Sequence, residues 1–203
     1  MIAIIDYGAG NIKSVINAFK FLGHECVLVS EPESLKEYSH IVLPGVGAFG
    51  EAMKKLKING MDEAIKEAVK SGKAFIGICL GMQLLFEKSF EFGEHEGLSL
   101  LPGEVVKFDE AKFDRPLKIP HVGWNTLSFK QNSPLRLGLK ELEYLYFVHS
   151  YHVVCDDKFA LAKTGYGYEF TSAVQHENLF GFQPHPEKSH EVGLKILENF
   201  ARL

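Results

Sequence analysis

The sequence lacks the features of secreted, metal-stapled and membrane-spanning proteins. Its 203 residues include only three cysteines, far apart and without a C-x-x-C pair, so neither a disulfide framework nor a structural zinc site is expected. No apolar run approaches the roughly 20 residues that span a bilayer, and Asp6 comes too early for a signal peptide. We therefore expect a soluble protein of the reducing cytoplasm, away from membranes and without a metal ion or cofactor.

An excess of charge of one sign is also missing. The 22 basic and 26 acidic residues are interspersed and give a formal net charge of −4, which does not indicate nucleic acid or an anionic membrane as a partner. Small molecules or proteins are the expected partners. With 46% hydrophobic residues, the chain can bury a full core, and we expect one domain spanning residues 1–203. The single tryptophan, Trp124, is by its residue type expected in that core.

In the first ninety residues, strand-like and helix-like apolar patterns alternate. Strands are predicted where short apolar runs occur, at residues 2–5, 25–29, 40–43 and 74–78. Helical spacing follows them at residues 12–22, 52–69 (one or two helices) and 80–86. Such alternation is typical of an α/β protein with a largely parallel sheet between helices, in which ligands bind at the carboxyl ends of the strands. The turns that follow the strands should therefore share one rim of the sheet.

From residue 97 the pattern changes to short β-type segments. They occur at residues 103–108, 121–129, 144–148, 151–154, 159–163, 171–176 and 179–183. Helical spacing returns only at residues 192–200. We expect antiparallel additions to the sheet, followed by a closing helix.

A cysteine lies between a predicted strand and a predicted helix in residues 77–83 (GICLGMQ). Gly77 and Gly81, two residues to either side, would let the strand and helix approach without Cβ clashes, as at a nucleophile elbow. The first amides of the helix would then favour a reactive thiolate at Cys79. Alternatively, Cys79 is a buried structural cysteine at the end of a strand. The motif alone does not decide between these two interpretations.

Two glycine-rich turns follow predicted strands. In residues 6–11 (DYGAGN), Gly8 and Gly10 with Glu31 about 20 residues later suggest dinucleotide binding. Lys13 stands where that fingerprint needs a third glycine, so a simple tight turn is favoured. Residues 44–50 (PGVGAFG) would expose backbone amides that can hold an oxyanion, although such a loop can also be only a turn.

A histidine and an acid lie two residues apart in residues 183–187 (QPHPE). The proline after His185 favours an extended backbone there, so His185 and Glu187 should face the same way and meet. A carboxylate that holds one imidazole nitrogen leaves the other free to accept a proton from a thiol. Taken singly, His185 could be a loop histidine, and Glu187 could be a solvated charge or the acid of a first helical turn. Together with Cys79 and an amide-rich loop, they predict a catalytic triad.

Residues 77–83 and 184–187 resemble the motifs of the class I, triad-type glutamine amidotransferases, whose fold is flavodoxin-like. Further segments resemble the subfamily of glutaminase subunits of imidazole glycerol phosphate synthases in histidine biosynthesis: residues 6–11 (DYGAGN), 44–49 (PGVGAF), 120–125 (PHVGWN) and 146–151 (YFVHSY). The resemblance runs nearly end to end. Val122 is a small departure, because this segment often has methionine there.

The resemblance implies hydrolysis of glutamine to glutamate and ammonia. Cys79 would be the nucleophile, His185 the base and then the acid, and Glu187 the group that orients His185. The remaining roles implied are oxyanion binding by the amides of Leu80 and the Val46–Gly47 peptide, and recognition of glutamine by Gln83, Glu91 and the backbone of His149, Ser150 and Tyr151.

The resemblance also implies a heterodimer with a (β/α)8 cyclase subunit. That subunit would capture ammonia and release imidazole glycerol phosphate and an aminoimidazole carboxamide ribotide. The residues of this chain that would face it are Asn11, His121, Trp124 and Asn125. Three alternatives remain: the same glutaminase serving another synthase, such as a sugar-amidating enzyme; a binding or regulatory protein that keeps the fold without catalysis; and a peptidase-like cysteine hydrolase.

Overall fold

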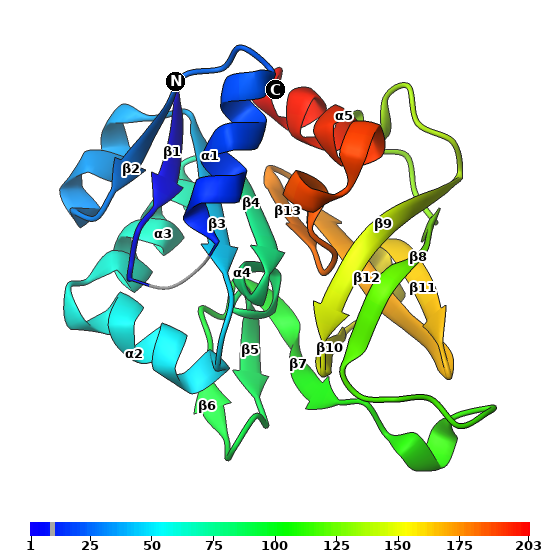
Figure 1. Cartoon of the computed structure of the whole chain (residues 1–203). Helices are drawn as coiled ribbons and strands as arrows, with labels where there is room; N and C mark the ends of the chain where they lie inside the picture. Colours follow the sequence, from blue (N-terminus) through cyan, green and yellow to red (C-terminus); the bar gives the residue numbers. More distant parts are fainter. Residues whose placement is uncertain (9–10) are drawn as a thin grey trace.

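The computed structural model describes residues 1–8 and 11–203 (Figure 1). Gly10 of the predicted glycine-rich turn lies outside the described residues. Within them, thirteen strands join in one mixed sheet. The strands are β1 (Ile2–Ile5), β2 (Cys26–Val29), β3 (His40–Gly45), β4 (Ala74–Cys79), β5 (Phe86–Ser89), β6 (His95–Glu96), β7 (Leu101–Lys107), β8 (His121–Phe129), β9 (Leu142–His149), β10 (Tyr151–Val154), β11 (Ala160–Tyr166), β12 (Tyr168–His176) and β13 (Leu179–Phe182).

The helices lie mainly in the first half and at the end of the chain. The α-helices are α1 (Ile12–Phe21), α2 (Phe49–Ile58), α3 (Met61–Lys70), α4 (Leu80–Gln83) and α5 (His190–Ala201). Short 3-10 helices are η1 (Pro32–Glu37), η2 (Glu110–Lys112), η3 (Pro134–Arg136), η4 (Asp157–Phe159) and η5 (Pro186–Lys188). The alternation predicted for the first ninety residues is confirmed in outline.

A parallel block forms one end of the sheet, in the order β2, β1, β3, β4, β13. Along β1 the side chains alternate between two cores: Ala3 and Ile5 join the core with α2 and α3, whereas Ile2 and Ile4 join the core with α1 and α5. Both faces of the block are therefore covered by helices (Figure 1). This is the predicted α/β architecture, and every residue of β1 is buried because both faces are packed.

The second half is largely antiparallel, as predicted, but two pairings differ. β13 runs parallel to β4, and β5 runs parallel to β7. The strand-rich region also begins earlier than expected, because α4 ends at Gln83 and β5 starts at Phe86. The predicted helix through residue 86 is wrong: Leu84, Leu85 and Phe86 are all fully buried, and a short apolar run of this kind does not distinguish helix from strand.

The parallel block places the predicted turns on one rim. β1, β3 and β4 run side by side in the same direction, so the segments after Ile5, Gly45 and Cys79 emerge at the same edge. The register pairs Gly45 with Cys79 and Phe182 with Ile78, which brings Gln183 beside Cys79 as well. Four segments that are far apart in the sequence therefore meet at one place.

Candidate active site

Cys79 lies at a sharp corner between β4 and α4. Its backbone has φ 54° and ψ −111°, a region that residues with a side chain rarely adopt. The predicted strand–turn–helix corner is confirmed. This backbone conformation directs the side chain away from both elements, and the sulfur lies 3.9 Å from the carbonyl oxygen of Val148.

Glycines permit this corner because other backbone approaches it closely. A Cβ on Gly81 would lie 1.9 Å from the carbonyl oxygen of Leu43 in β3, and a Cβ on Gly77 would lie 2.5 Å from the carbonyl oxygen of Gly81. Gly45 is equally restricted, since a Cβ there would lie 2.9 Å from the amide nitrogen of Gly81. The elbow thus depends on three glycines, one of them in the neighbouring strand.

We expect Gly81→Ala to destabilise the protein by about 3 kcal/mol, because backbone atoms of β3 would have to move to admit the methyl group. For a chain of this length that loss lowers the melting temperature by roughly 6–12 °C, which thermal unfolding measures. The matched control is Gly165→Ala in β11, where φ is ordinary and an added Cβ meets no atom within 4 Å. Equal melting temperatures for the two variants would contradict the packing argument.

His185 and Glu187 meet as predicted, although by a different backbone route. His185 is extended, with φ −102° and ψ 92°, but Glu187 lies in the short helix η5. Nδ1 of His185 is 2.7 Å from Oε1 of Glu187, and both side chains are almost completely buried. Since a carboxylate only accepts, Nδ1 carries the proton and Nε2 is left to face Cys79.

The pKa of His185 is set by burial and by the two groups that its ring nitrogens face, Cys79 and Glu187. Burial by itself would lower the pKa of the imidazole, but the sulfur of Cys79 and the carboxylate of Glu187 together raise it to about 10. In the part of the chain that the structure describes, Nε2 of His185 has no nitrogen or oxygen partner. Its hydrogen-bond partner is therefore the sulfur of Cys79. The arrangement therefore favours the imidazolium form of His185 at neutral pH.

The backbone of His185 is held by β9 and α5. Its amide donates to the carbonyl oxygen of Tyr146 at 2.9 Å, and its carbonyl oxygen accepts from the hydroxyl of Ser189 at 2.6 Å. Ser189 in turn accepts from the amide of Tyr146 at 3.0 Å. A Cβ on Gly193 would lie 1.9 Å from the carbonyl oxygen of Pro186, so α5 packs directly on this segment. Sequence reasoning missed Ser189 and Gly193; a glycine inside an apolar helix was the available signal.

A cavity of about 380 Å³ opens beside Cys79. It brings together all the residues predicted to bind glutamine or its oxyanion, and adds Phe92, Pro120 and Val148. The lining residues are Val46, Gly47, Cys79, Leu80, Gln83, Glu91, Phe92, Pro120, Val148, His149, Ser150 and Tyr151. His185 and Glu187 are not among these lining residues.

Two polar side chains of the cavity are held by hydrogen bonds. Gln83 is buried, and its Nε2 donates to the carbonyl oxygen of Tyr151 at 3.1 Å and to Oε1 of Gln183 at 2.9 Å. Oε2 of Glu91 accepts from the amide of Phe49, the first residue of α2, at 2.7 Å. Gln83 and Glu91 are therefore not ordinary exposed side chains.

The comparisons with known proteins agree with this geometry. The family model described as glutamine amidotransferase class-I matches residues 3–203. The chain belongs to this family. One relative, "Imidazole glycerol phosphate synthase subunit HisH" of Sulfurimonas denitrificans, is 60% identical over 100% of the chain and 98% of its own length. The protein of the same name from Wolinella succinogenes is 52% identical over the full length of both chains. The resemblance inferred from the motifs is thereby confirmed.

Solved structures agree on the fold of this amidotransferase. The structure titled "Structure of PurLQS from Thermotoga maritima" aligns with a TM-score of 0.77 at 22% identity, covering 99% of this chain and 97% of the other. Another, titled "Crystal structure of glutamine amidotransferase", aligns with a TM-score of 0.75 at 20% identity, covering 99% and 100%. At these identities the likeness concerns the fold alone.

Tyr7 of the amidotransferase supports a loop of the site, a role that sequence reasoning did not assign. Its buried hydroxyl donates to the carbonyl oxygen of Pro44 at 3.0 Å, at the base of the loop that carries Val46 and Gly47. Burial, and then the charge of Cys79, raise the pKa of Tyr7 above its ordinary value, so the hydroxyl stays a donor. Gly47 has φ +105°, a conformation suited to glycine. Tyr7 thus ties the turn after β1 to this loop.

The four residues predicted to face a partner are placed differently from one another. The side chain of Trp124 is 47% exposed, which overturns the expectation from residue type that it is core; its ring stacks on His190. Asn11 and Asn125 are half-buried. His121 is only 3% exposed, so its side chain does not lie on the surface, because its ring is packed between Phe147 and Tyr166.

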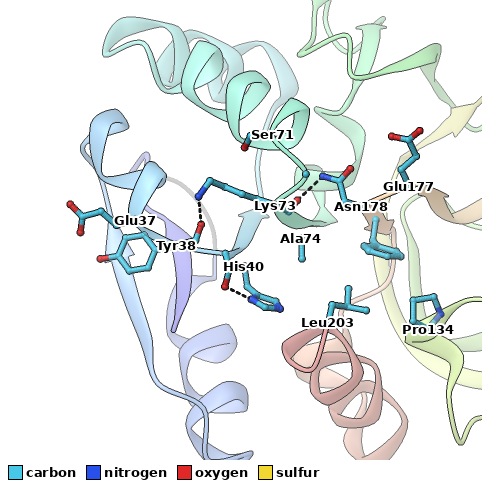
Figure 2. A pocket seen from close by; sticks show the side chains of 13 residues that line it. Glu37, Tyr38, His40, Ser71, Lys73, Ala74, Pro134, Glu177, Asn178 and Leu203 are labelled. Atoms are coloured by element: carbon cyan, nitrogen blue, oxygen red, sulfur yellow. Dashed lines mark hydrogen bonds between the residues drawn. The ribbon is translucent and has the colours of Figure 1, made fainter.

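A second hollow, of about 650 Å³, lies at the other edge of the sheet (Figure 2). His40 and Ala74, at the amino ends of β3 and β4, line it, whereas the triad lies at the carboxyl ends. It is therefore not the site of the thiol chemistry. Among residues 1–8 and 11–203, no group of three His, Cys, Asp or Glu side chains could hold a metal ion. In the same residues, no helix has the length and apolar character needed to cross a membrane.

Proposed function

We propose that this chain is the glutaminase subunit of an imidazole glycerol phosphate synthase, with residues 1–203 forming one glutamine amidotransferase domain. The observation that carries the proposal is that Cys79 and the His185–Glu187 pair meet beside a cavity of about 380 Å³. A cavity of this volume is in the range that takes a small molecule. The names of relatives that are 60% and 52% identical over the whole chain support the choice of synthase.

In the proposed reaction, the sulfur of Cys79 attacks the side-chain carboxamide carbon of glutamine. The C–S bond forms while the π electrons of the carbonyl move to oxygen. The protonated His185 then gives its proton to the nitrogen, the C–N bond breaks, and ammonia leaves. His185 next deprotonates a water molecule, which opens the glutamyl thioester and releases glutamate. Glutamine and water become glutamate and ammonia, and no cofactor is required.

The oxyanion of the intermediate would be held by the amide of Leu80 and by the Val46–Gly47 peptide. Leu80 starts α4 directly after Cys79, and Val46 and Gly47 line the same cavity. A donor of this kind typically contributes roughly 3 kcal/mol to transition-state stabilisation. Tyr7 supports the second donor indirectly, through its hydrogen bond to Pro44.

The amino-acid end of glutamine would be bound on the other side of the cavity. The carboxylate of Glu91 can accept from the substrate ammonium while it keeps its bond to Phe49. Because Nε2 of Gln83 is engaged by two acceptors, its Oε1 is the atom suited to face the substrate. The backbone of His149, Ser150 and Tyr151 would complete the site.

An exposed apolar surface next to the cavity supports a protein partner. On the outer face of β8 and β9, Val122, Trp124, Tyr144 and Val148 are 55%, 47%, 57% and 36% exposed. Val148 also lines the cavity, so this surface and the site of ammonia release adjoin. Exposed apolar patches often mark interaction sites. In water at neutral pH ammonia is mostly ammonium, which has no lone pair, so a cyclase subunit docked here would gain by receiving it directly.

Asn11, Trp124 and Asn125 would then face the cyclase subunit in a heterodimer. Since His121 is buried, we assign it a supporting position beneath Asn125 rather than a contact with the partner. The three cysteines are free, which supports a reducing compartment and hence the cytoplasm.

We expect Trp124→Ala to weaken binding and coupling to the cyclase at least tenfold, because a large exposed aromatic is a typical interface anchor. The isolated subunit should lose only a few degrees of melting temperature, since Trp124 is half-exposed and its main contact is the stack on His190. Titration of the cyclase and thermal unfolding measure the two effects. The control is Phe21→Ala, an aromatic that is 78% exposed at the end of α1. A large loss of melting temperature without a change in cyclase affinity would show that Trp124 stabilises the fold and does not bind the cyclase.

The proposed function is tested by a glutaminase assay with and without the purified cyclase subunit. Glutamate formation, and glutamine-dependent formation of imidazole glycerol phosphate by the mixture, are the expected results. If glutamate forms but the cyclase neither binds nor gives product, the alternative is favoured, in which the same glutaminase serves another synthase such as a sugar-amidating enzyme. If no glutamate forms with any synthase, the proposal is wrong.

A further inference from the structure

We propose that Gln183 is a further catalytic residue, whose side-chain amide donates a hydrogen bond to the sulfur of Cys79. Nε2 of Gln183 lies 3.7 Å from Sγ, and the side chain is fully buried. The position follows from the register of β13 on β4, which pairs Phe182 with Ile78. Gln183 directly follows Phe182, and Cys79 directly follows Ile78, so Gln183 and Cys79 lie side by side.

The orientation of the Gln183 carboxamide is determined by a backbone carbonyl. The carbonyl oxygen of Tyr151 can only accept, so Gln83 must present its NH2 group to it, at 3.1 Å. The same NH2 group donates to Gln183 at 2.9 Å, so Gln183 must present its oxygen there. The remaining end of Gln183, its NH2 group, is then directed at Cys79. The donor at the sulfur is thus specified by its neighbours.

The Tyr151 carbonyl is itself anchored by two buried histidines. Nδ1 of His149 donates to it at 2.8 Å, so Nε2 of His149 accepts, here from Nδ1 of His121 at 2.9 Å. Nε2 of His121 accepts from the side-chain NH2 of Asn125 at 3.2 Å. Burial lowers the pKa of His121 to about 4 and that of His149 to about 3, so both stay neutral and keep these tautomers. Two runs of hydrogen bonds therefore meet at the Tyr151 carbonyl, because His149 and Gln83 both donate to it, and together they connect Asn125 with the sulfur.

The donor matters because the sulfur also faces an acceptor. The carbonyl oxygen of Val148, 3.9 Å from Sγ, favours the neutral thiol, which can donate to it. Gln183 and the protonated His185 favour the anionic sulfur, to which each can donate. Loss of the Gln183 donor should therefore shift the balance toward the unreactive thiol.

The test compares two variants. Gln183→Glu keeps an oxygen for Gln83 and replaces the donor by a carboxylate oxygen, while Gln183→Met keeps the volume without polar atoms. For both we expect kcat for glutamine hydrolysis to fall about tenfold to a hundredfold with a smaller change in KM. The pH dependence of Cys79 alkylation by iodoacetamide should move to higher pH. The control is Gln175→Met in β12, which removes a carboxamide that makes no contact with Cys79.

The kcat measurement rests on the proposed function, whereas alkylation requires only the thiol. A chain that hydrolyses no glutamine but shows the alkylation shift would refute the glutaminase and keep the Gln183 assignment. Thermal unfolding and binding to the cyclase check that each variant of this chain is folded. An unchanged alkylation profile in either folded variant overturns the assignment. If neither variant folds, the side-chain amide resonances of Gln183 in the unmutated protein decide: they should shift when Cys79 is alkylated, and constant resonances overturn the assignment.

Discussion

Cys79→Ala is expected to abolish glutamine-dependent synthesis by the assembled complex while leaving ammonia-dependent synthesis intact. The variant lacks the sulfur that forms the glutamyl thioester, so glutamate formation should fall by at least about 10⁴-fold. Added ammonia bypasses this step, because the cyclase chemistry takes place in the partner. Glutamate release and cyclase product formation, each measured with glutamine and with an ammonium salt, separate the two steps.

Cys26→Ala and Cys155→Ala are the controls for the thiol. Both cysteines are free, and neither lines the cavity. Burial raises the pKa of Cys155 to about 11, which makes it a poor nucleophile at neutral pH. Activities within about twofold of the unmutated protein are expected for both. Normal glutamine hydrolysis by Cys79→Ala, or its loss in either control, would assign the nucleophile to another group.

Glu187→Gln is expected to lower the glutaminase rate by about 10³- to 10⁴-fold, by analogy with the loss of a triad carboxylate elsewhere. Glu187 accepts from Nδ1 of His185 at 2.7 Å and so keeps Nε2 directed at Cys79 with the right protonation. A carboxamide can instead donate to Nδ1, which places the proton on Nε2 of the neutral imidazole and prevents it from acting as a base. Steady-state rates measure the loss, and Glu191→Gln, an exposed acid of α5, is the control.

The same variant has a pH signature whose sign follows from the charges. The pKa of His185 is raised to about 10 by Cys79 and Glu187, against the lowering effect of burial. Removing the carboxylate removes one of the two stabilising charges, so the pKa falls and the imidazolium loses its proton at lower pH. The alkaline limb of the kcat/KM profile of the residual activity should therefore move to lower pH. A limb that stayed in place or moved to higher pH would contradict the coupling between His185 and Glu187.

Local patterns were sufficient where the chemistry is carried by neighbours in the chain. The corner at Cys79 followed from a strand pattern, a helix pattern and two glycines. The His185–Glu187 contact was also predicted, but the extended backbone assumed for it is wrong beyond His185, because Glu187 lies in η5. The same reasoning failed for the helix after Cys79, which ends at Gln83, because a short apolar run such as residues 84–86 does not distinguish helix from strand. It also failed for Trp124, because residue type does not decide whether a particular side chain is exposed.

The sequence by itself determined the alternating sheet and helices, the cysteine corner, the His-x-Glu pair and the family. Only the tertiary structure decided which distant groups act on the sulfur, since the parallel pairing of β13 with β4 brings Gln183 and His185 to Cys79 across about a hundred residues of chain. It also decided the tautomers of His121 and His149, and the support of Pro44 by Tyr7. The physical reason is that strand register and burial are properties of the assembled sheet, and no local pattern specifies either.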